Sequence, residues 1–247
     1  MSANMSKLPP LPLPSGITAR YVPTDSGLDQ HVLEAGDPGQ PLLLLLHGFP
    51  ELAFSWRHVM VPLAKAGFHV VAPDQRGYGR TTGWEPGFDC DLYSYSLPNR
   101  VRDAVALVRA LGYERVYACI GHDYGAHVTA IAGLLRPDVF QRIACMSAPF
   151  GGAPAISSKF DPVHEGLLAL SPPRKHYQWY YSTRSADRDM LDAPQGLQAF
   201  LRAYFHMKSA DWAENRPHVL QGWTASELAK LPTYYVMHAD ETMAGTV

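Results

Sequence analysis

The chain has 247 residues, of which 47% are hydrophobic and 18% charged, and its formal net charge is −2. This is a globular composition, and the weak charge gives no electrostatic reason to bind nucleic acid or an anionic membrane. The longest apolar runs, Leu42–Leu46 among them, are far too short to span a bilayer. The three cysteines lack metal-ligand spacing and the N-terminus lacks a signal-peptide pattern. We therefore expect a soluble, cytoplasmic protein without a metal or organic cofactor.

Strand-like and helix-like segments alternate through the first part of the chain, after a loose lead-in at residues 1–17. The apolar run Leu42–Leu46 suits a strand that is buried on both faces of a parallel sheet. Apolar residues at helical spacing predict helices between the strands. This alternation predicts an α/β protein with a mostly parallel sheet, whose ligands bind outside the carboxyl ends of the strands. The predicted strands are 18–22, 30–34, 42–46, 68–72, 116–120 and 142–146, and the predicted helices are 55–66, 98–111 and 126–135.

The alternation stops after Pro149. From Phe150 onward no clear buried strand is evident, and Tyr, Trp, His and Pro are frequent. Helical patterns occur near residues 175–183 and 194–205. We therefore predict an α/β core over residues 18–149, followed by a second, mainly helical region over residues 150–247.

One predicted strand ends in an unusual turn. Ile120 is followed by Gly121-His122-Asp123-Tyr124-Gly125 and then by small residues in a helical segment. A strand, a sharp glycine turn and a helix form the layout of a nucleophile elbow, which presents one side chain above the sheet. That side chain would be Asp123. An ordinary turn in which Asp123 caps the helix is the alternative explanation.

Two further strand ends carry motifs that would converge with this turn on one edge of the sheet. They are His47-Gly48-Phe49-Pro50-Glu51 and Pro73-Asp74-Gln75-Arg76-Gly77-Tyr78-Gly79. In order and spacing the three motifs resemble the α/β-hydrolase superfamily, and within it the epoxide hydrolases, over about residues 18–150 and more weakly through a lid-like region beyond. The resemblance implies that residues 150–247 form the lid. The resemblance implies that Asp123 is the nucleophile and that the backbone N–H groups of Phe49 and Tyr124 form an oxyanion hole.

Aspartate at the elbow, where serine is usual, changes the expected reaction. Attack of a carboxylate on an ester would give an anhydride, whereas attack on a strained or halide-bearing carbon gives a stable alkyl ester. Water then cleaves this ester with help from the oxyanion hole. We therefore predict a hydrolase that opens small apolar epoxides. Haloalkane or haloacid dehalogenation, and binding of a small apolar ligand without turnover, remain as alternatives.

Opening an epoxide requires an acid near the developing alkoxide. The family uses lid tyrosines for this purpose, and the resemblance assigns the first of them to Tyr177. Tyr181 lies one helical turn later and could be the acid instead or line the substrate site. Packing of an aromatic helix face is the structural alternative. Trp56 lines either the substrate site or the core. Family dehalogenases place Trp or Arg after the nucleophile, and Tyr124 departs from both.

Hydrolysis of the ester requires a histidine and an acid that orients it, and in this superfamily both follow the nucleophile near the last strands. His122 should point away from the nucleophile, and no later histidine follows a convincing strand in a glycine-rich turn. The segment 231–240 could hold the acid as Asp240, but we assign it to the lid. We therefore expect the histidine and the acid to lie beyond Val247, the last core strands to be missing, and this chain to be inactive or limited to one turnover.

Overall fold

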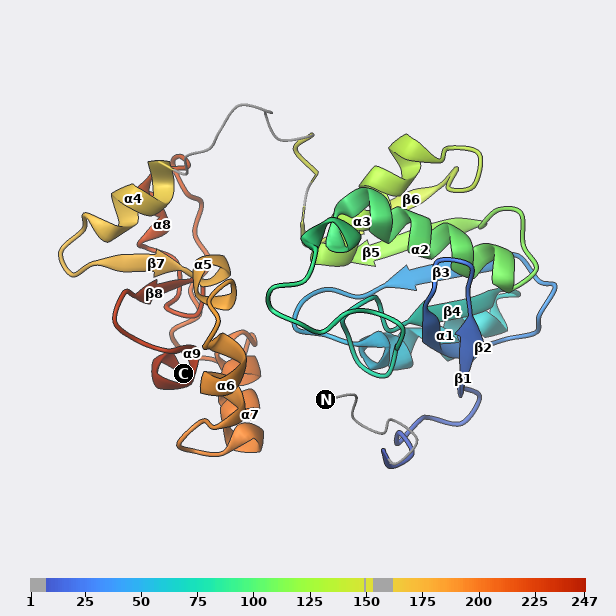
Figure 1. Ribbon diagram of the computed structural model, residues 1–247, viewed down its shortest axis with the longest axis horizontal. Coiled ribbons are helices and arrows are strands. Elements are labelled where there is room, and N and C mark those ends of the chain that lie inside the picture. The colour runs from blue at the N-terminus through green and yellow to red at the C-terminus, as the bar shows by residue number, and fades with distance from the viewer. Residues whose placement is uncertain (1–7, 149, 153–161) are drawn as a thin grey trace. The chain divides into compact units, whose positions relative to one another are not determined.

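The computed structural model describes residues 8–148, 150–152 and 162–247. The chain divides into two compact units, Met1–Ala153 and Pro154–Val247 (Figure 1). Residues 1–7 of the predicted lead-in lie outside the described residues, as does residue 149 at the predicted domain boundary. In the part of the chain that is described, no helix is long and apolar enough to cross a membrane.

The first unit is built on a six-stranded sheet (Figure 1). Its order is β1-β2-β4-β3-β5-β6. Strand β2 pairs antiparallel with β1 and with β4, and the other neighbouring strands pair parallel. This arrangement and the flanking helices confirm the predicted α/β fold with a mostly parallel sheet. The strands are β1 (Thr18–Pro23), β2 (Asp29–Ala35), β3 (Leu42–Leu46), β4 (His69–Pro73), β5 (Ala118–His122) and β6 (Ile143–Met146).

Helices cover both faces of this sheet, and β3 shows how. Its side chains alternate between the faces, and all five are buried. Leu42, Leu44 and Leu46 pack with residues of α2 (Leu97–Ala110) and α3 (Tyr124–Leu135). Leu43 and Leu45 pack with residues of the 3₁₀ helix η2 (Ala53–Trp56) and of α1 (Arg57–Lys65). A second 3₁₀ helix, η3 (Leu92–Tyr95), precedes α2. The parallel strands thus end at one edge, where the three motifs follow them.

The strand before the elbow differs from its predicted range. The sequence places it at residues 116–120, whereas β5 covers Ala118–His122. Gly121 pairs with Leu46 on one side and with Cys145 on the other, so neighbouring strands hold the first part of the glycine motif in the sheet. The turn is therefore a single residue, Asp123, and α3 begins directly after it.

The second unit combines short helices with a two-stranded antiparallel sheet. Its strands are β7 (Arg174–His176) and β8 (Val236–His238), and Val236 and Met237 are buried. The expectation that no buried strand follows Phe150 is wrong, because a three-residue strand is too short to show alternation. β8 lies within the segment that we assigned to the lid, and it pairs with β7 rather than with the six-stranded sheet. The helices are α4 (Pro162–Leu168), α5 (Tyr177–Tyr181), α6 (Ala186–Leu191), α7 (Leu197–Met207), α8 (Ala225–Leu228) and α9 (Met243–Thr246).

Candidate active site

The turn at Asp123 has a strained backbone that glycines make possible. Asp123 has φ 53° and ψ −117°, a conformation that residues with a Cβ rarely adopt. A Cβ at Gly121 would lie 2.1 Å from the carbonyl oxygen of Gly125, and a Cβ at Gly125 would lie 2.2 Å from that of Leu46. Both positions therefore require glycine. The Asp123 side chain makes no capping hydrogen bond to α3, so the structure contradicts the explanation of Asp123 as an ordinary helix cap.

The Asp123 carboxylate faces the loop that follows β3. The backbone N–H of Phe49 donates to Asp123 Oδ1 over 3.0 Å, and a Cβ at Gly48 would lie 2.5 Å from the Asp123 Cβ. Tyr124 is the first residue of α3, so its N–H has no carbonyl partner within the helix. The structure thus brings together Asp123 and the Phe49 N–H, two of the predicted site groups, and Oδ1 is the oxygen that the backbone binds.

His47 fixes the loop that carries Phe49. It is fully buried; its Nδ1 lies 2.8 Å from the carbonyl oxygen of Gly48, and its Nε2 accepts the N–H of Gln75 over 3.1 Å. Burial lowers the pKa of His47. Because Nε2 accepts a hydrogen bond, the neutral ring carries its proton on Nδ1 and donates it to Gly48. The Gln75 side chain also donates to the His47 carbonyl over 2.6 Å. His47 thus ties the loop after β3 to the loop after β4.

His122 is directed at Glu51. Its Nδ1 lies 3.1 Å from Glu51 Oε2, and the same oxygen accepts the N–H of Gly48 over 3.4 Å. This pairing agrees with the expectation that His122 points away from the nucleophile. It also ties the residue before Asp123 to the loop that carries Phe49. Sequence reasoning missed this contact.

Asp74 and Arg76 have separate structural partners. Asp74 Oδ2 lies 2.8 Å from Nδ1 of His31, and Oδ1 accepts the N–H of Ala53 over 2.9 Å. Burial alone would raise the pKa of Asp74, but these hydrogen bonds hold it below its usual value. Arg76 makes two hydrogen bonds of 2.7 Å to the carboxylate of Asp103. Both residues anchor the loop after β4 beside the site.

Arg100 is a buried cation near the elbow that the sequence did not indicate. Its side chain donates to the carbonyl oxygen of Arg76, and its Nε has no hydrogen-bond partner. Within the described ranges no carboxylate pairs with it. The guanidinium carbon lies 5.4 Å from the ring of Tyr95 and 5.9 Å from that of Tyr124. At these distances the rings attract the cation, so Arg100 and the Tyr124 ring hold one another in place.

The predicted lid tyrosines lie in the second unit. The N–H of Tyr177 donates to the carbonyl of Tyr235 over 2.8 Å, and its ring centroid lies 5.5 Å from that of Tyr235 and 6.0 Å from that of Tyr181. Burial raises the pKa of Tyr181 to about 12, so its hydroxyl keeps its proton at neutral pH. Tyr177 and Tyr181 both pack against the cluster that contains Phe200 and Tyr204.

Trp56, one of the predicted site residues, lies in the core. It packs in the cluster around η2 and α1, and its indole N–H is unpaired.

Among the described histidines, none hydrogen-bonds to the carboxylate of Asp123. The Nδ1 of His127 lies 3.3 Å from the main-chain oxygen of Asp123 instead. Across the described residues no cluster of His, Cys, Asp or Glu could hold a metal ion.

A carboxylate on a strained strand-to-helix turn, held by a backbone N–H from the loop after β3, is the architecture of an α/β hydrolase. The family described as alpha/beta hydrolase fold matches residues 41–226, and the chain belongs to this family. Curated proteins that are similar to this chain include proteins named as epoxide hydrolases, which confirms the resemblance predicted from the three motifs.

Two relatives come from Mycobacterium tuberculosis. The chain is 45% identical to epoxide hydrolase A over 132 residues, which cover 53% of this chain and 39% of that protein. It is 36% identical to epoxide hydrolase B over 179 residues, which cover 69% of this chain and 48% of that protein. The chain thus spans about half the length of these two relatives, or less.

Solved structures give the same picture. The crystal structure of epoxide hydrolase A from Mycobacterium thermoresistibile matches with a TM-score of 0.63 and 34% identity, over 79% of this chain and 57% of that chain. A laboratory-evolved variant of potato epoxide hydrolase matches with a TM-score of 0.63 and 35% identity, over 76% of this chain and 56% of that chain.

Proposed function

We propose that this chain carries the alkylating half of an epoxide hydrolase reaction, with Asp123 as the nucleophile. The observation that supports this most directly is the Asp123 carboxylate on a strained turn, with Oδ1 bound by the Phe49 N–H. The relatives named as epoxide hydrolases support the same reaction class. The substrate would be a small apolar epoxide.

The first step uses the two carboxylate oxygens differently. Because Oδ1 is held by the backbone, Oδ2 attacks an epoxide carbon and forms a C–O bond while the ring C–O bond breaks. The bond electrons pass to the ring oxygen, which takes a proton from the hydroxyl of Tyr177. The product is a hydroxyalkyl ester of Asp123. A positioned tyrosine O–H lowers the barrier because a free alkoxide is far too basic to form in a dry site.

The second step is the cleavage of this ester by water. Attack on the Asp123 carboxyl carbon puts negative charge on Oδ1, which the Phe49 N–H already binds and to which the Tyr124 N–H can add. The step needs a base to activate water, and no described histidine is at the carboxylate. We therefore propose that this chain alone stops at the ester or releases it slowly.

The alternative reaction, carbon–halogen cleavage, needs donors that face a leaving halide. The residue after the nucleophile supplies such a donor in the family dehalogenases. Here the Tyr124 ring packs with the cluster around α2 and contacts Arg100 instead. This position favours the epoxide over the halide as the substrate.

Intact-mass analysis after incubation with styrene oxide tests the proposal. We expect one adduct of substrate mass, which maps to the peptide with Asp123 and is lost in Asp123→Ala. Cys145 is exposed and could be alkylated nonspecifically, so Cys145→Ser is the matched control and should keep the adduct. An adduct that persists in Asp123→Ala, or free chloride released from a chloroalkane in place of an epoxide adduct, would overturn the assignment.

A further inference from the structure

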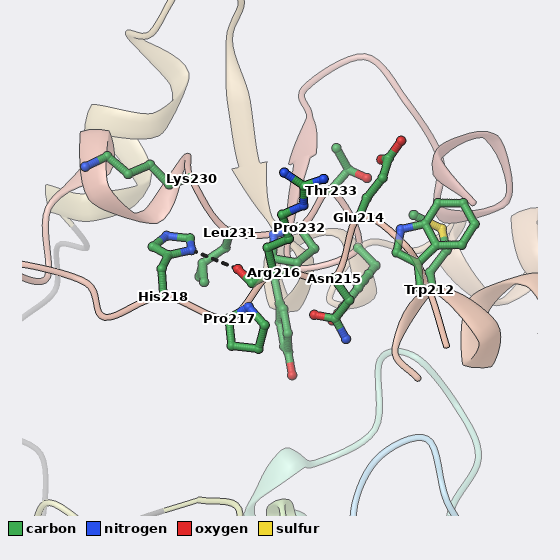
Figure 2. A pocket seen from close by; sticks show the side chains of 13 residues that line it. Trp212, Glu214, Asn215, Arg216, Pro217, His218, Lys230, Leu231, Pro232 and Thr233 are labelled. Atoms are coloured by element: carbon green, nitrogen blue, oxygen red, sulfur yellow. Dashed lines mark hydrogen bonds between the residues drawn. The ribbon is translucent and has the colours of Figure 1, made fainter. Parts of the chain in front are cut away.

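The second unit contains a pocket that the proposed reaction does not use. It has a volume of about 430 Å³ and is formed by the segments 212–218 and 230–235, together with Met207 at the end of α7 (Figure 2). This volume lies within the range of about 300–1,000 Å³ that is typical of small-molecule sites. All of its lining residues belong to the second unit, so it is separate in the chain from the elbow that carries Asp123.

The walls of the pocket are largely flat and apolar. Trp212 contributes an aromatic face, and Pro217 and Pro232 contribute rigid apolar ones. Tyr234 is almost fully buried, and the ammonium of Lys208 lies 5.5 Å from its ring centroid. The Tyr234 ring is therefore held in place and leaves little free surface for a ligand. Such walls suit a ligand with a flat hydrophobic body.

The polar groups of the pocket leave one cation available. Lys230 pairs with Glu227 outside the pocket, and His218 Nδ1 lies 3.3 Å from the main-chain oxygen of Arg216. The guanidinium of Arg216 is exposed and has no hydrogen-bond or ion-pair partner in the described part of the chain. Figure 2 shows the Arg216 and Glu214 side chains on the same side of their segment, with Asn215 between them directed to the opposite side.

We propose that this pocket binds a hydrophobic monocarboxylate, with the carboxylate on Arg216 and the flat body against Trp212. Arginine suits this role because its planar guanidinium donates two parallel hydrogen bonds to a carboxylate. Glu214 is a competing anion on the same side. It limits the ligand to a single negative charge, because a second carboxylate would meet it.

Titration calorimetry on the whole chain tests the site, with phenylbutyrate as the ligand and the neutral amide phenylbutyramide as its isostere. We expect the acid to bind at least about tenfold more tightly than the amide, because a charge-assisted hydrogen bond contributes more than a neutral one. Arg216→Gln should weaken phenylbutyrate binding by about tenfold. Arg202→Gln is the matched control, since Arg202 lies on α7 outside the pocket, and should leave binding unchanged.

The role of Glu214 gives an effect of opposite sign. Glu214→Gln removes the competing anion and should tighten phenylbutyrate binding by a few fold. If Glu214→Gln weakens binding, or if phenylbutylamine binds better than phenylbutyrate, the pocket is an amine site and the proposal fails. Equal binding of acid and amide, or unchanged binding in Arg216→Gln, also overturns it. Asp123→Ala should bind phenylbutyrate like the original chain, which keeps this result independent of the proposed hydrolase function.

Discussion

The two units organise their functional groups in different ways. In the first unit, backbone geometry and buried hydrogen bonds fix the site: Gly121 and Gly125 permit the turn at Asp123, and His47 ties two loops together. In the second unit, packed aromatic rings place the hydroxyl groups, as in the cluster around Tyr204. The first unit should therefore be sensitive to single added atoms and lost ion pairs. The second unit should tolerate added atoms and lost ion pairs, and should respond to the loss of an aromatic ring or a hydroxyl group.

The largest expected difference concerns ion pairs. Arg76 and Asp103 are both buried, and their two hydrogen bonds compensate for the desolvation of the charges. Asp103→Ala leaves Arg76 buried and unpaired beside Arg100, and should lower the free energy of unfolding by about 3–5 kcal/mol. Lys230→Ala in the second unit removes an exposed lysine and breaks its pair with Glu227, and should change little. Urea unfolding followed by circular dichroism measures both; similar small shifts would remove the contrast.

Added methyl groups give the next largest effect. Gly125→Ala places a Cβ against the carbonyl oxygen of Leu46, which belongs to a buried strand and cannot move aside. We expect a destabilisation of about 3 kcal/mol or more. In Gly245→Ala the new Cβ meets only the hydroxyl of Thr242 at 3.5 Å, and alanine suits a helix better than glycine. That variant should be neutral or slightly stabilised in the same unfolding measurement.

Loss of a hydroxyl should matter in the second unit. Tyr177→Phe removes the proposed proton donor and should slow the formation of the Asp123 adduct by about 10²–10³-fold. Tyr181→Phe removes a hydroxyl that is hydrogen-bonded within the tyrosine cluster and should leave the rate close to the original. Mass spectrometry of the adduct over time gives both rates. The reverse order would assign the acid to Tyr181, and equal rates would exclude both hydroxyls from the reaction.

The smallest expected effect is a change in the stability of the first unit at low pH. Burial alone would raise the pKa of Glu34, but hydrogen bonds from His69 and Arg20 lower it from 4.5 to about 2. A carboxylate whose pKa is lower in the folded than in the unfolded chain stabilises the fold at pH values above the unfolded pKa. This contribution is lost as the pH falls from 4.5 toward 2. The difference in stability between the original chain and Glu34→Gln should therefore shrink over this range. A constant difference would mean that the carboxylate charge contributes nothing.

The sequence predicts local features of the site and misses those made by distant residues. The elbow follows from one stretch of glycines around Asp123, and the burial of β3 follows from five consecutive leucines. The hydrogen bond from Gln75 to His47 joins residues 28 apart, and the contact of His122 with Glu51 joins residues 71 apart. Neither separation produces a periodic pattern.

Burial of charge is equally hidden in the sequence. Arg100 occupies the first turn of a helix whose apolar face is clear from the spacing, and it reads as one more exposed basic residue. Its burial depends on Tyr95 and Tyr124, which come from η3 and α3. In the second unit the spacing indicates α7, whereas the three-residue strands β7 and β8 become visible only when they pair.

The backbone of Asp123 has a consequence for the evolutionary history of this position. A non-glycine residue in so rare a conformation costs about 1–3 kcal/mol, whereas glycine adopts positive φ without a steric penalty. One nucleotide change converts an aspartate codon into a glycine codon. In a lineage that no longer needs the chemistry, mutation and selection for stability would both favour that change. The nucleophile would then be lost while the sheet, the turn and α3 remained intact.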